Sequence, residues 1–503
     1  MPSGKKIILY ELNEVPWVVV DSFVASHPHS NLASLMARGQ SLTTVLINET
    51  APLQPWRTWP SFHTSQLASD HNSIDLGQDP GTFHGATMWD AAETAGLTVG
   101  LFGPMQSWPA RPLRTGGFWI PDTFARDEVC FPTSINRFQA FNLAATKENG
   151  FSPDTALRPG ALARVGYDLV RRGMTAKTAW YLSRSVLRER KDGRNKAGRS
   201  ILQALPCFDL YWRLHRRHAP ALSIFFTNHV AGMMHRYWGD AMADYKTVEP
   251  DYVPDPVFAT MITRAMEVAD AQFGRIRRYV DNHPDTILMI AGSMGQEAIA
   301  KGHRPPQVVL SDPERLFKAL GLGPIEVGSA MYPSYSLLLS KDDDPDAVIK
   351  AFGSLTAANG NAVLDRFRMT GRTLQFSVPY TSGVASPTEL MTFTPLGATT
   401  SRTEQLDHLG MELRTRLGGA NTGYHIPEGI TVVYGKGIAP DPSRTRVDLL
   451  DKAPSILANI LGVPPAPTMA GKPTLFTDLG VTPPATTQPA AAPPVAQASA
   501  TPA

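Results

Sequence analysis

Short runs of apolar residues that stop abruptly at polar clusters are the clearest pattern in this chain. They lie near residues 10 (KKIILYELNE), 225 (ALSIFFTNH), 290 (TILMIAGSMGQ) and 433 (GITVVYGKG). Runs of this length and composition predict buried strands. Between them lie segments with apolar residues at helical spacing, such as SNLASLMARG, TMWDAAETAG and DPVFATMITRAMEVADAQFGRIRRYVDNH. The alternation predicts an α/β protein with a doubly wound, mostly parallel sheet, whose ligands bind beyond the carboxyl ends of the strands.

Two stretches interrupt this alternation and predict insertions. Residues 125–205 form a helical block that is locally basic, and residues 305–405 alternate short apolar runs with Gly and Pro. A Pro and Ala tail follows, over 481–503, and its composition predicts disorder. The expected α/β core therefore consists of residues 1–124, 206–304 and 406–480.

The basic block has far more cationic than anionic side chains. We consider two interpretations: a lid or a surface for an anionic substrate or lipid headgroups, or else a solvated pair of amphipathic helices. The charged residues on which both depend are Arg164, Arg171, Arg172, Lys177, Arg184, Arg188, Arg190, Lys191, Arg194, Lys196 and Arg199, against Asp168, Glu189 and Asp192.

Bulk composition excludes several classes of protein. The chain is 43% hydrophobic with a formal net charge of +2, which gives no global reason to expect a nucleic-acid partner. Cys130 and Cys207 are far apart, so neither a disulfide framework nor a thiolate zinc site is expected.

The N-terminus lacks the long apolar segment of a signal peptide, and no apolar run approaches the roughly 20 residues of a membrane span. We expect a cytoplasmic protein.

The segment QPWRTWPSFHTSQLASDHNSI contains the best candidate for a nucleophile, Thr58. Pro60 suits a first helical turn, which would place Thr58 at a helix N-terminus. Free backbone N–H groups and the helix dipole favour a bound phosphate and an alkoxide there. The alternative is that Thr58 is simply an N-cap.

Several landmarks occur together in a familiar order. TWPSFHTSQLASDHNSI is similar to a nucleophile turn, TNHVAGMMHRYW to a metal-binding segment after a central strand, and TGYHIPEGITVVYGKGI to a late histidine element. NLASLMARG, MWDAAETAGLTVGLFGPMQSWP and LLDKAPSILANILGVPPAPTMAGKPT complete the series. In this order they resemble the alkaline phosphatase superfamily, in its branch of type I phosphodiesterases and nucleotide pyrophosphatases.

The resemblance implies a site with two divalent metals, often zinc, beside a Thr or Ser nucleophile. The nucleophile position falls on Thr58, and two histidine ligands fall on His235 and His425. The remaining ligands are eroded, because the first-strand Asp falls on Asn13 and another Asp falls on Ala231. The Asp-His-Gly element is replaced by Ser293-Met294-Gly295, and a thioether is a poor ligand for a hard cation.

A reduced site with a single divalent metal, most simply zinc, is the expectation that remains. Its ligands would be Glu11, His229, His235 and His425, with Asn13 a neutral oxygen ligand at best. His229 and His235 lie about 240° apart on an ideal helix, so they share a metal only if the segment begins as a loop. Alternatively, each histidine is a hydrogen-bonded buried residue, and Glu11 and Glu14 are strand-end acids.

Three further residues, Arg57, Asn228 and Gln296, are expected to contact the substrate, although Arg57 could equally form a surface salt bridge. The leading functional hypothesis is a hydrolase of phosphoesters or phosphodiesters, or a phosphoryl-type transferase, in which Thr58 attacks phosphorus. One alternative is an inactive member that binds a phosphorylated glycan, lipid or partner protein. Another is an enzyme repurposed for a different reaction.

Overall fold

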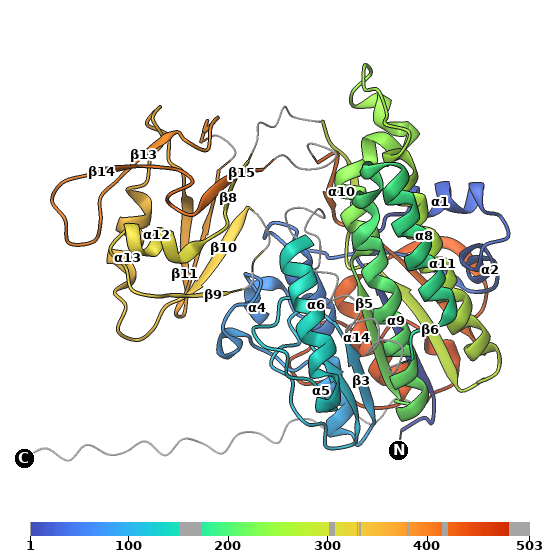
Figure 1. Ribbon diagram of the computed structural model, residues 1–503. Coiled ribbons are helices and arrows are strands. Elements are labelled where there is room, and N and C mark those ends of the chain that lie inside the picture. Colours follow the sequence, from blue (N-terminus) through green and yellow to red (C-terminus); the bar gives the residue numbers. More distant parts are fainter. Residues whose placement is uncertain are drawn as a thin grey trace, which may run out of the picture.

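The computed structural model describes residues 2–149, 173–300, 307–328, 330, 333–379, 382–414 and 421–481 (Figure 1). Of the charged residues named in the basic block, Arg164, Asp168, Arg171 and Arg172 lie outside these ranges, as does the Pro and Ala tail from residue 482 onward. Within the described ranges, no helix combines the length and apolar character that crossing a membrane requires.

A large, mostly parallel sheet forms the centre of the protein, which is a mixed α/β fold as the alternation predicts. Its order is β18-β2-β17-β6-β1-β5-β3-β4. All neighbouring pairs are parallel except those of β17, which runs antiparallel to both β2 and β6. The predicted strands near residues 10, 225, 290 and 433 are confirmed as β1, β5, β6 and β17. The eight strands are β1 (Lys6–Leu12), β2 (Gln40–Val45), β3 (Val99–Phe102), β4 (Gly117–Ile120), β5 (Leu222–Thr227), β6 (Thr286–Ala291), β17 (Glu428–Gly435) and β18 (Asp441–Asp448).

The central strand β1 shows how the two faces of the sheet are covered. Successive side chains point to opposite faces, so Ile8, Tyr10 and Leu12 enter one hydrophobic core while Ile7 and Leu9 enter the other. Both faces of the strand are buried, which explains why the strands read as continuous apolar runs.

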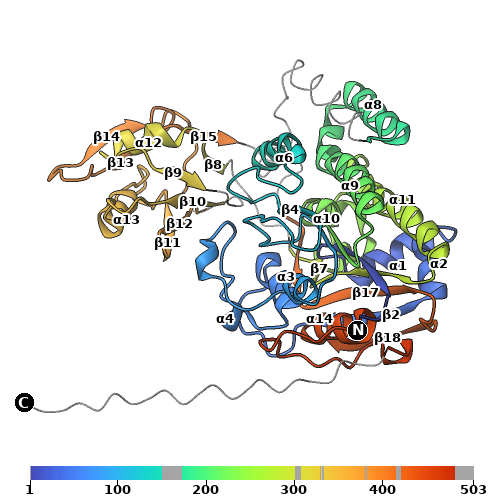
Figure 2. The same ribbon diagram turned by 90° about the horizontal axis from the view of Figure 1, so that it is seen from below.

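Helices cover both faces of the sheet (Figure 2). The predicted helices around residues 35, 91 and 271 are confirmed as α2, α5 and α11, and α5 begins with a capping box between Thr87 and Asp90. On the first face lie α1 (Trp17–Ser26), α2 (Asn31–Arg38), α9 (Arg199–His218), α10 (His229–Ala241) and α11 (Met261–Asp281). On the second lie α3 (Pro55–Thr64), α5 (Met88–Thr94) and α14 (Lys452–Ser455).

The basic block contributes α6 (Asn136–Asn149) and α8 (Ala176–Lys191), and α8 packs beside α9. Its cysteine, Cys130, is buried and unpaired, and Cys207 in α9 is also a free thiol. Burial raises the pKa of both thiols to about 12.

Residues 307–414 build a hydrophobic core of their own, and Figure 1 shows this part, in yellow and orange, beside the main body. A four-stranded antiparallel sheet, in the order β11-β12-β10-β9, is its largest element. Its elements are α12 (Pro313–Ala319), β9 (Glu326–Gly328), β10 (Ser334–Leu338), α13 (Pro345–Gly353), β11 (Asp365–Thr370), β12 (Thr373–Ser377), β13 (Leu390–Phe393) and β14 (Arg402–Gln405).

Two antiparallel strand pairs connect this part to the main body. The outer pair is β8 (Gln307–Leu310) with β15 (Met411–Arg414), and the inner pair is β7 (Gly295–Ala298) with β16 (Gly423–Ile426). In the inner pair His425 lies opposite Gln296. The β7–β16 pair therefore contains Gln296 and His425, two of the candidate site residues named from the sequence.

Candidate metal centre

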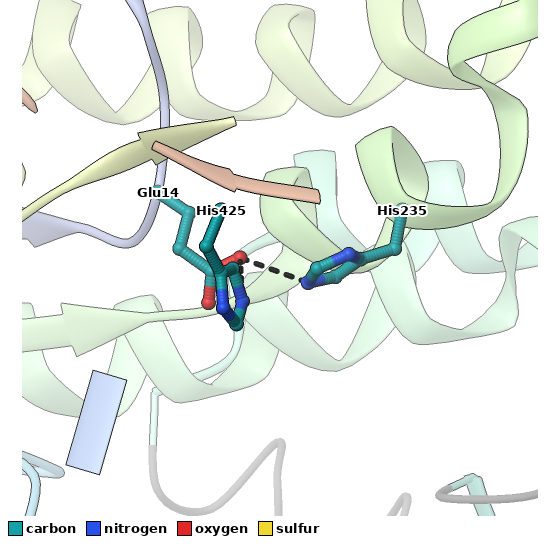
Figure 3. A group of neighbouring side chains, drawn as sticks. All are labelled: Glu14, His235 and His425. Atoms are coloured by element: carbon teal, nitrogen blue, oxygen red, sulfur yellow. Dashed lines mark ion pairs between the residues drawn. The ribbon is translucent and has the colours of Figure 1, made fainter. Parts of the chain in front are cut away.

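Three side chains from distant parts of the chain converge beyond the ends of β1 and β5. They are Glu14, His235 and His425, and one possible ligand atom from each lies within 4.8 Å of the others (Figure 3). Glu14 Oε2 is 2.9 Å from His235 Nε2 and 3.3 Å from His425 Nε2. Two imidazole nitrogens and a carboxylate oxygen thus point at one spot, a donor set that zinc favours.

The backbone of the protein fixes the orientation of both imidazole rings. His235 Nδ1 lies 2.9 Å from the carbonyl oxygen of Gly423, and His425 Nδ1 lies 2.9 Å from that of Leu53. Each ring therefore carries its proton on Nδ1 and presents a lone pair on Nε2 when it is neutral. Metal-binding histidines are commonly held by such a bond from the second nitrogen.

Local structure explains how Glu14 reaches the cluster. The chain turns immediately after β1, and Glu14 adopts a φ of 59°, in the left-handed region that a non-glycine residue rarely occupies. Gln296, opposite His425 in the β7–β16 pair, donates a hydrogen bond to Glu14 Oε2. Its own Oε1 atom is buried and has no hydrogen-bond partner in the described part of the chain. This unpaired oxygen is a further polar group beside the cluster.

Charge interactions within the cluster are strong. Burial alone would raise the pKa of Glu14, but the two imidazoles beside it hold that pKa well below its usual range. Burial would likewise lower the pKa of His425, but the Glu14 carboxylate raises it above its usual value. Glu14 is therefore ionised and carries the negative charge that a divalent cation requires.

Glu11, which the sequence suggested as a ligand, lies in a different pair. Its side chain is fully buried and contacts His63 Nε2 at 2.6 Å. As a member of β1, Glu11 points to the opposite face of the sheet from Tyr10 and Leu12, and α3 covers that face. The structure does not bring Glu11 to the cluster, and the adjacent acid Glu14 takes that place.

His229 is also separate from the cluster. It begins α10, its Nδ1 lies 2.7 Å from Thr227 Oγ1, and its Nε2 lies 3.0 Å from the carbonyl oxygen of Ala265 in α11. Burial lowers the pKa of His229 to about 4. Because the segment is helical from residue 229 onward, His229 and His235 face different neighbours, as the angular separation predicted for a helix.

Thr58 lies within α3 rather than at its end. The helix begins at Pro55 after the N-cap Gln54, so the Thr58 N–H is already bonded to the Gln54 carbonyl, and Pro60 lies inside the helix. Pro55, and not Pro60, occupies the first turn, so the expected free N–H at Thr58 and its alternative role as N-cap are both wrong. The Thr58 hydroxyl lies 2.8 Å from the Ser293 hydroxyl, and the residue is only 1% exposed.

Asn13 connects α3 to the cluster. Its Nδ2 donates to Glu14 Oε1 at 2.7 Å and to Asn228 Oδ1 at 2.6 Å, while its Oδ1 accepts the indole N–H of Trp59 at 2.7 Å. The Asn13 oxygen therefore faces Trp59, and its amide nitrogen, which cannot bind a cation, faces Glu14. Asn228 stays near the cluster through the same bond.

Among the residues that the structure describes, Arg57 has no carboxylate partner, so the surface salt bridge that the sequence left open is not seen there. Its guanidinium donates to the carbonyl oxygens of Ile74, at 3.2 Å, and Pro52, at 3.4 Å. Burial lowers the pKa of this half-buried side chain.

Among the described residues, Glu14, His235 and His425 are the one group of at least three acidic, histidine or cysteine side chains whose ligand atoms lie close enough together to hold a metal ion. The Thr58 hydroxyl has the Ser293 hydroxyl as its hydrogen-bond partner, and Met294, the next residue along the chain, is fully buried. A hydroxyl and a thioether supply neither a carboxylate nor an imidazole as ligand. Of the ligands expected from the sequence, the structure brings His235 and His425 together and places Glu11 elsewhere, beside His63, a residue that the sequence did not single out. The signal for Glu14 is its position one residue past the strand-end Asn13.

Comparison with known proteins does not identify the function of this cluster. No family model matches the chain, and no curated protein does. Among solved structures, two of the murine ectonucleotide pyrophosphatase/phosphodiesterase 5 match 94% of this chain, at 11% sequence identity and a TM-score of 0.41. The match covers 99% of one of those chains, described as an inactive form in complex with AMP, and 100% of the other. A similarity at this level says nothing about the chemistry of this chain.

Proposed function

We propose that this protein is a phosphoester or phosphodiester hydrolase, or a phosphoryl-type transferase with the same covalent chemistry, built around a single divalent cation. The observation that carries the proposal is the convergence of His235 Nε2 and His425 Nε2 on one oxygen of Glu14, at 2.9 and 3.3 Å. The order of sequence landmarks, which places the nucleophile position of the phosphodiesterase branch on Thr58, supports the reaction class.

In this proposal Glu14, His235 and His425 hold the cation, and zinc suits their donor atoms best. A bound cation of this kind supplies Lewis-acid stabilisation of negative charge on a phosphoryl oxygen. Asn13 and Gln296 hold the Glu14 carboxylate in place through the hydrogen bonds described above. Such supporting bonds tune metal affinity in known metal sites.

Thr58 is the nucleophile in the proposed reaction. Its oxygen forms a bond to phosphorus as the bond from phosphorus to the leaving oxygen breaks, and the hydroxyl proton goes to the leaving alcohol. Water or an acceptor alcohol later displaces Thr58, whose oxygen takes back the proton that the acceptor loses. Ser293, 2.8 Å from Thr58, is the adjacent group that can accept a hydrogen bond from the attacking hydroxyl. Asn228 is exposed beside the cluster and is proposed to contact the substrate.

One observation favours a second candidate function. Thr58 is only 1% exposed, and its hydroxyl is already paired with Ser293. An ester reaches such a group only if the covering residues move. A protein that keeps the cation and binds a phosphorylated small molecule, glycan or lipid without cleaving it would show the same geometry.

The experiment combines metal analysis with turnover of aryl phosphate monoesters and diesters. The zinc-loaded protein should hydrolyse at least one of these esters, and Thr58→Ala should abolish hydrolysis while retaining the metal. Thr58→Ser should keep part of the activity, because it keeps a hydroxyl. His408→Ala is the matched control, since His408 is an exposed histidine remote from the cluster.

Unchanged turnover in Thr58→Ala would eliminate Thr58 as the nucleophile. A metal-loaded protein that binds a phosphate ester but turns over none of them would favour the second candidate.

A further inference from the structure

Helix α8 presents an unusual face to solvent. Lys177, Trp180, Arg184, Leu187 and Lys191 are spaced three or four residues apart, so they form one stripe along the helix. All five are exposed, and Trp180 and Leu187 are 55% and 56% exposed. This face therefore offers both exposed apolar area and positive charge, the two contributions that bind a surface helix to an anionic membrane.

The opposite face of α8 is firmly held. Thr178 and Ser185 are buried, and Asp209 of α9 accepts hydrogen bonds from the Thr175 backbone at 2.9 Å and the Thr178 hydroxyl at 2.6 Å. The exposed stripe is therefore a stable outer surface and not the inner face of a displaced helix.

The charges of this stripe are not neutralised within the described residues. Lys177, Arg184 and Lys191 have no carboxylate partner there, and Arg184 instead lies over the Trp180 ring at 5.1 Å. Glu189 is the single acid in the helix, and it pairs with Arg199 at 2.8 Å. The helix thus offers positive charge and apolar surface together.

A basic pocket opens at the N-terminal end of the same helix. It has a volume of about 510 Å³ and is lined by Asp209, Trp212, Arg213, Arg216, Arg217 and Arg275, with Gly173 at its edge. Asp209 is its acid, and that carboxylate already binds Arg275 and the start of α8. Arg216 and Arg217 are exposed and have no ion-pair partner among the residues described.

We propose that α8 and this arginine pocket together bind the surface of an anionic phospholipid bilayer. Trp180 and Leu187 enter the headgroup region, the lysines and arginines of the stripe attract the anionic surface, and Arg216 and Arg217 bind a headgroup phosphate. Guanidinium groups suit phosphate oxygens because they donate paired hydrogen bonds. Charge complementarity selects this occupant over an uncharged or cationic protein surface.

Co-sedimentation with vesicles tests the proposal, using the full chain and phosphatidylcholine vesicles with and without phosphatidylglycerol. Binding should require the anionic lipid and weaken as salt is added. Trp180→Ala/Leu187→Ala and Arg216→Ala/Arg217→Ala should each weaken binding by about tenfold or more, because two surface contacts are lost each time. Val253→Ala and Arg402→Ala are matched controls at exposed positions outside α8 and the pocket, and they should bind normally.

Four results would overturn the proposal. The first is no binding to anionic vesicles at low salt, and the second is equal losses in the test and control variants. The third is self-association without vesicles that Trp180→Ala/Leu187→Ala abolishes, which would make the stripe a contact between copies of this chain. Binding of free glycerol phosphate to the pocket without any vesicle binding would also contradict it, since the pocket would then serve a soluble phosphate.

Discussion

Trp59 donates its indole N–H to Asn13 at 2.7 Å, and this bond joins the helix that carries Thr58 to the turn that carries Glu14. Asn13 in turn donates to Glu14. The candidate nucleophile and the candidate metal ligands are therefore linked through a few buried polar groups, and the linkage can be tested by removing one of them.

Trp59→Phe should lower the free energy of unfolding by about 1–3 kcal/mol, because the buried Asn13 Oδ1 atom would lose its partner. Chemical denaturation measures this loss. Trp108→Phe is the matched control, since the Trp108 indole nitrogen is buried without a partner among the described residues. Its removal should cost little, and an equal loss in the two variants would show that ring packing, not the hydrogen bond, is responsible.

The Glu11 and His63 pair should matter for stability and not for metal binding. Both side chains are buried, and Glu11→Leu alone would leave His63 without its partner, at a cost of about 3–5 kcal/mol. The double variant Glu11→Leu/His63→Leu should be less destabilised than the sum of the single variants. Strict additivity would mean that the two groups do not interact.

Lys452 should give the stability an unusual pH dependence. Its side chain is fully buried, contacts the Thr431 hydroxyl and lies 5.4 Å from the Phe62 ring. Burial lowers its pKa from 10.5 to about 7. Between these two pH values the unfolded chain binds a proton that the folded chain does not, so the free energy of unfolding should rise as the pH rises from about 7 to about 10.

Lys452→Met removes this titration and keeps a similar volume. The variant should lose the rise between pH 7 and 10 and should be more stable than the natural protein at pH 7, because no buried amine then needs to lose its proton. Denaturation series at several pH values measure both effects. An unchanged slope in the variant would assign the pH dependence to other groups.

Much of the fold could be predicted from the sequence because strands buried on both faces are continuous apolar runs. The segments around Tyr10 and Phe225 illustrate this, since both lie in the middle of a parallel sheet. The direction of β17 could not be predicted, because its apolar run reads the same whether the strand is parallel or antiparallel.

The predicted start of α3 lies a few residues after the observed start. Either proline, Pro55 or Pro60, is compatible with a first helical turn, and the structure has Pro55 there. The position of Glu14, and not the expected Glu11, beside His235 and His425 has a different origin. It depends on the left-handed turn at Glu14 and on which face of β1 Glu11 occupies, and neither feature has a signature in the sequence. The motif order predicts that His235 and His425 share one site, and the structure brings the two side chains together.

Zinc binding by the metal-free protein tests the central claim most directly. Isothermal titration calorimetry, with metal analysis after dialysis, should give one zinc per chain for the natural protein and for Glu11→Gln. It should give at least about tenfold weaker binding for Glu14→Gln and for His235→Ala/His425→Ala, each of which removes proposed ligands. Absence of zinc binding by the natural protein, or binding by Glu14→Gln and His235→Ala/His425→Ala as tight as that of the natural protein, would contradict the account.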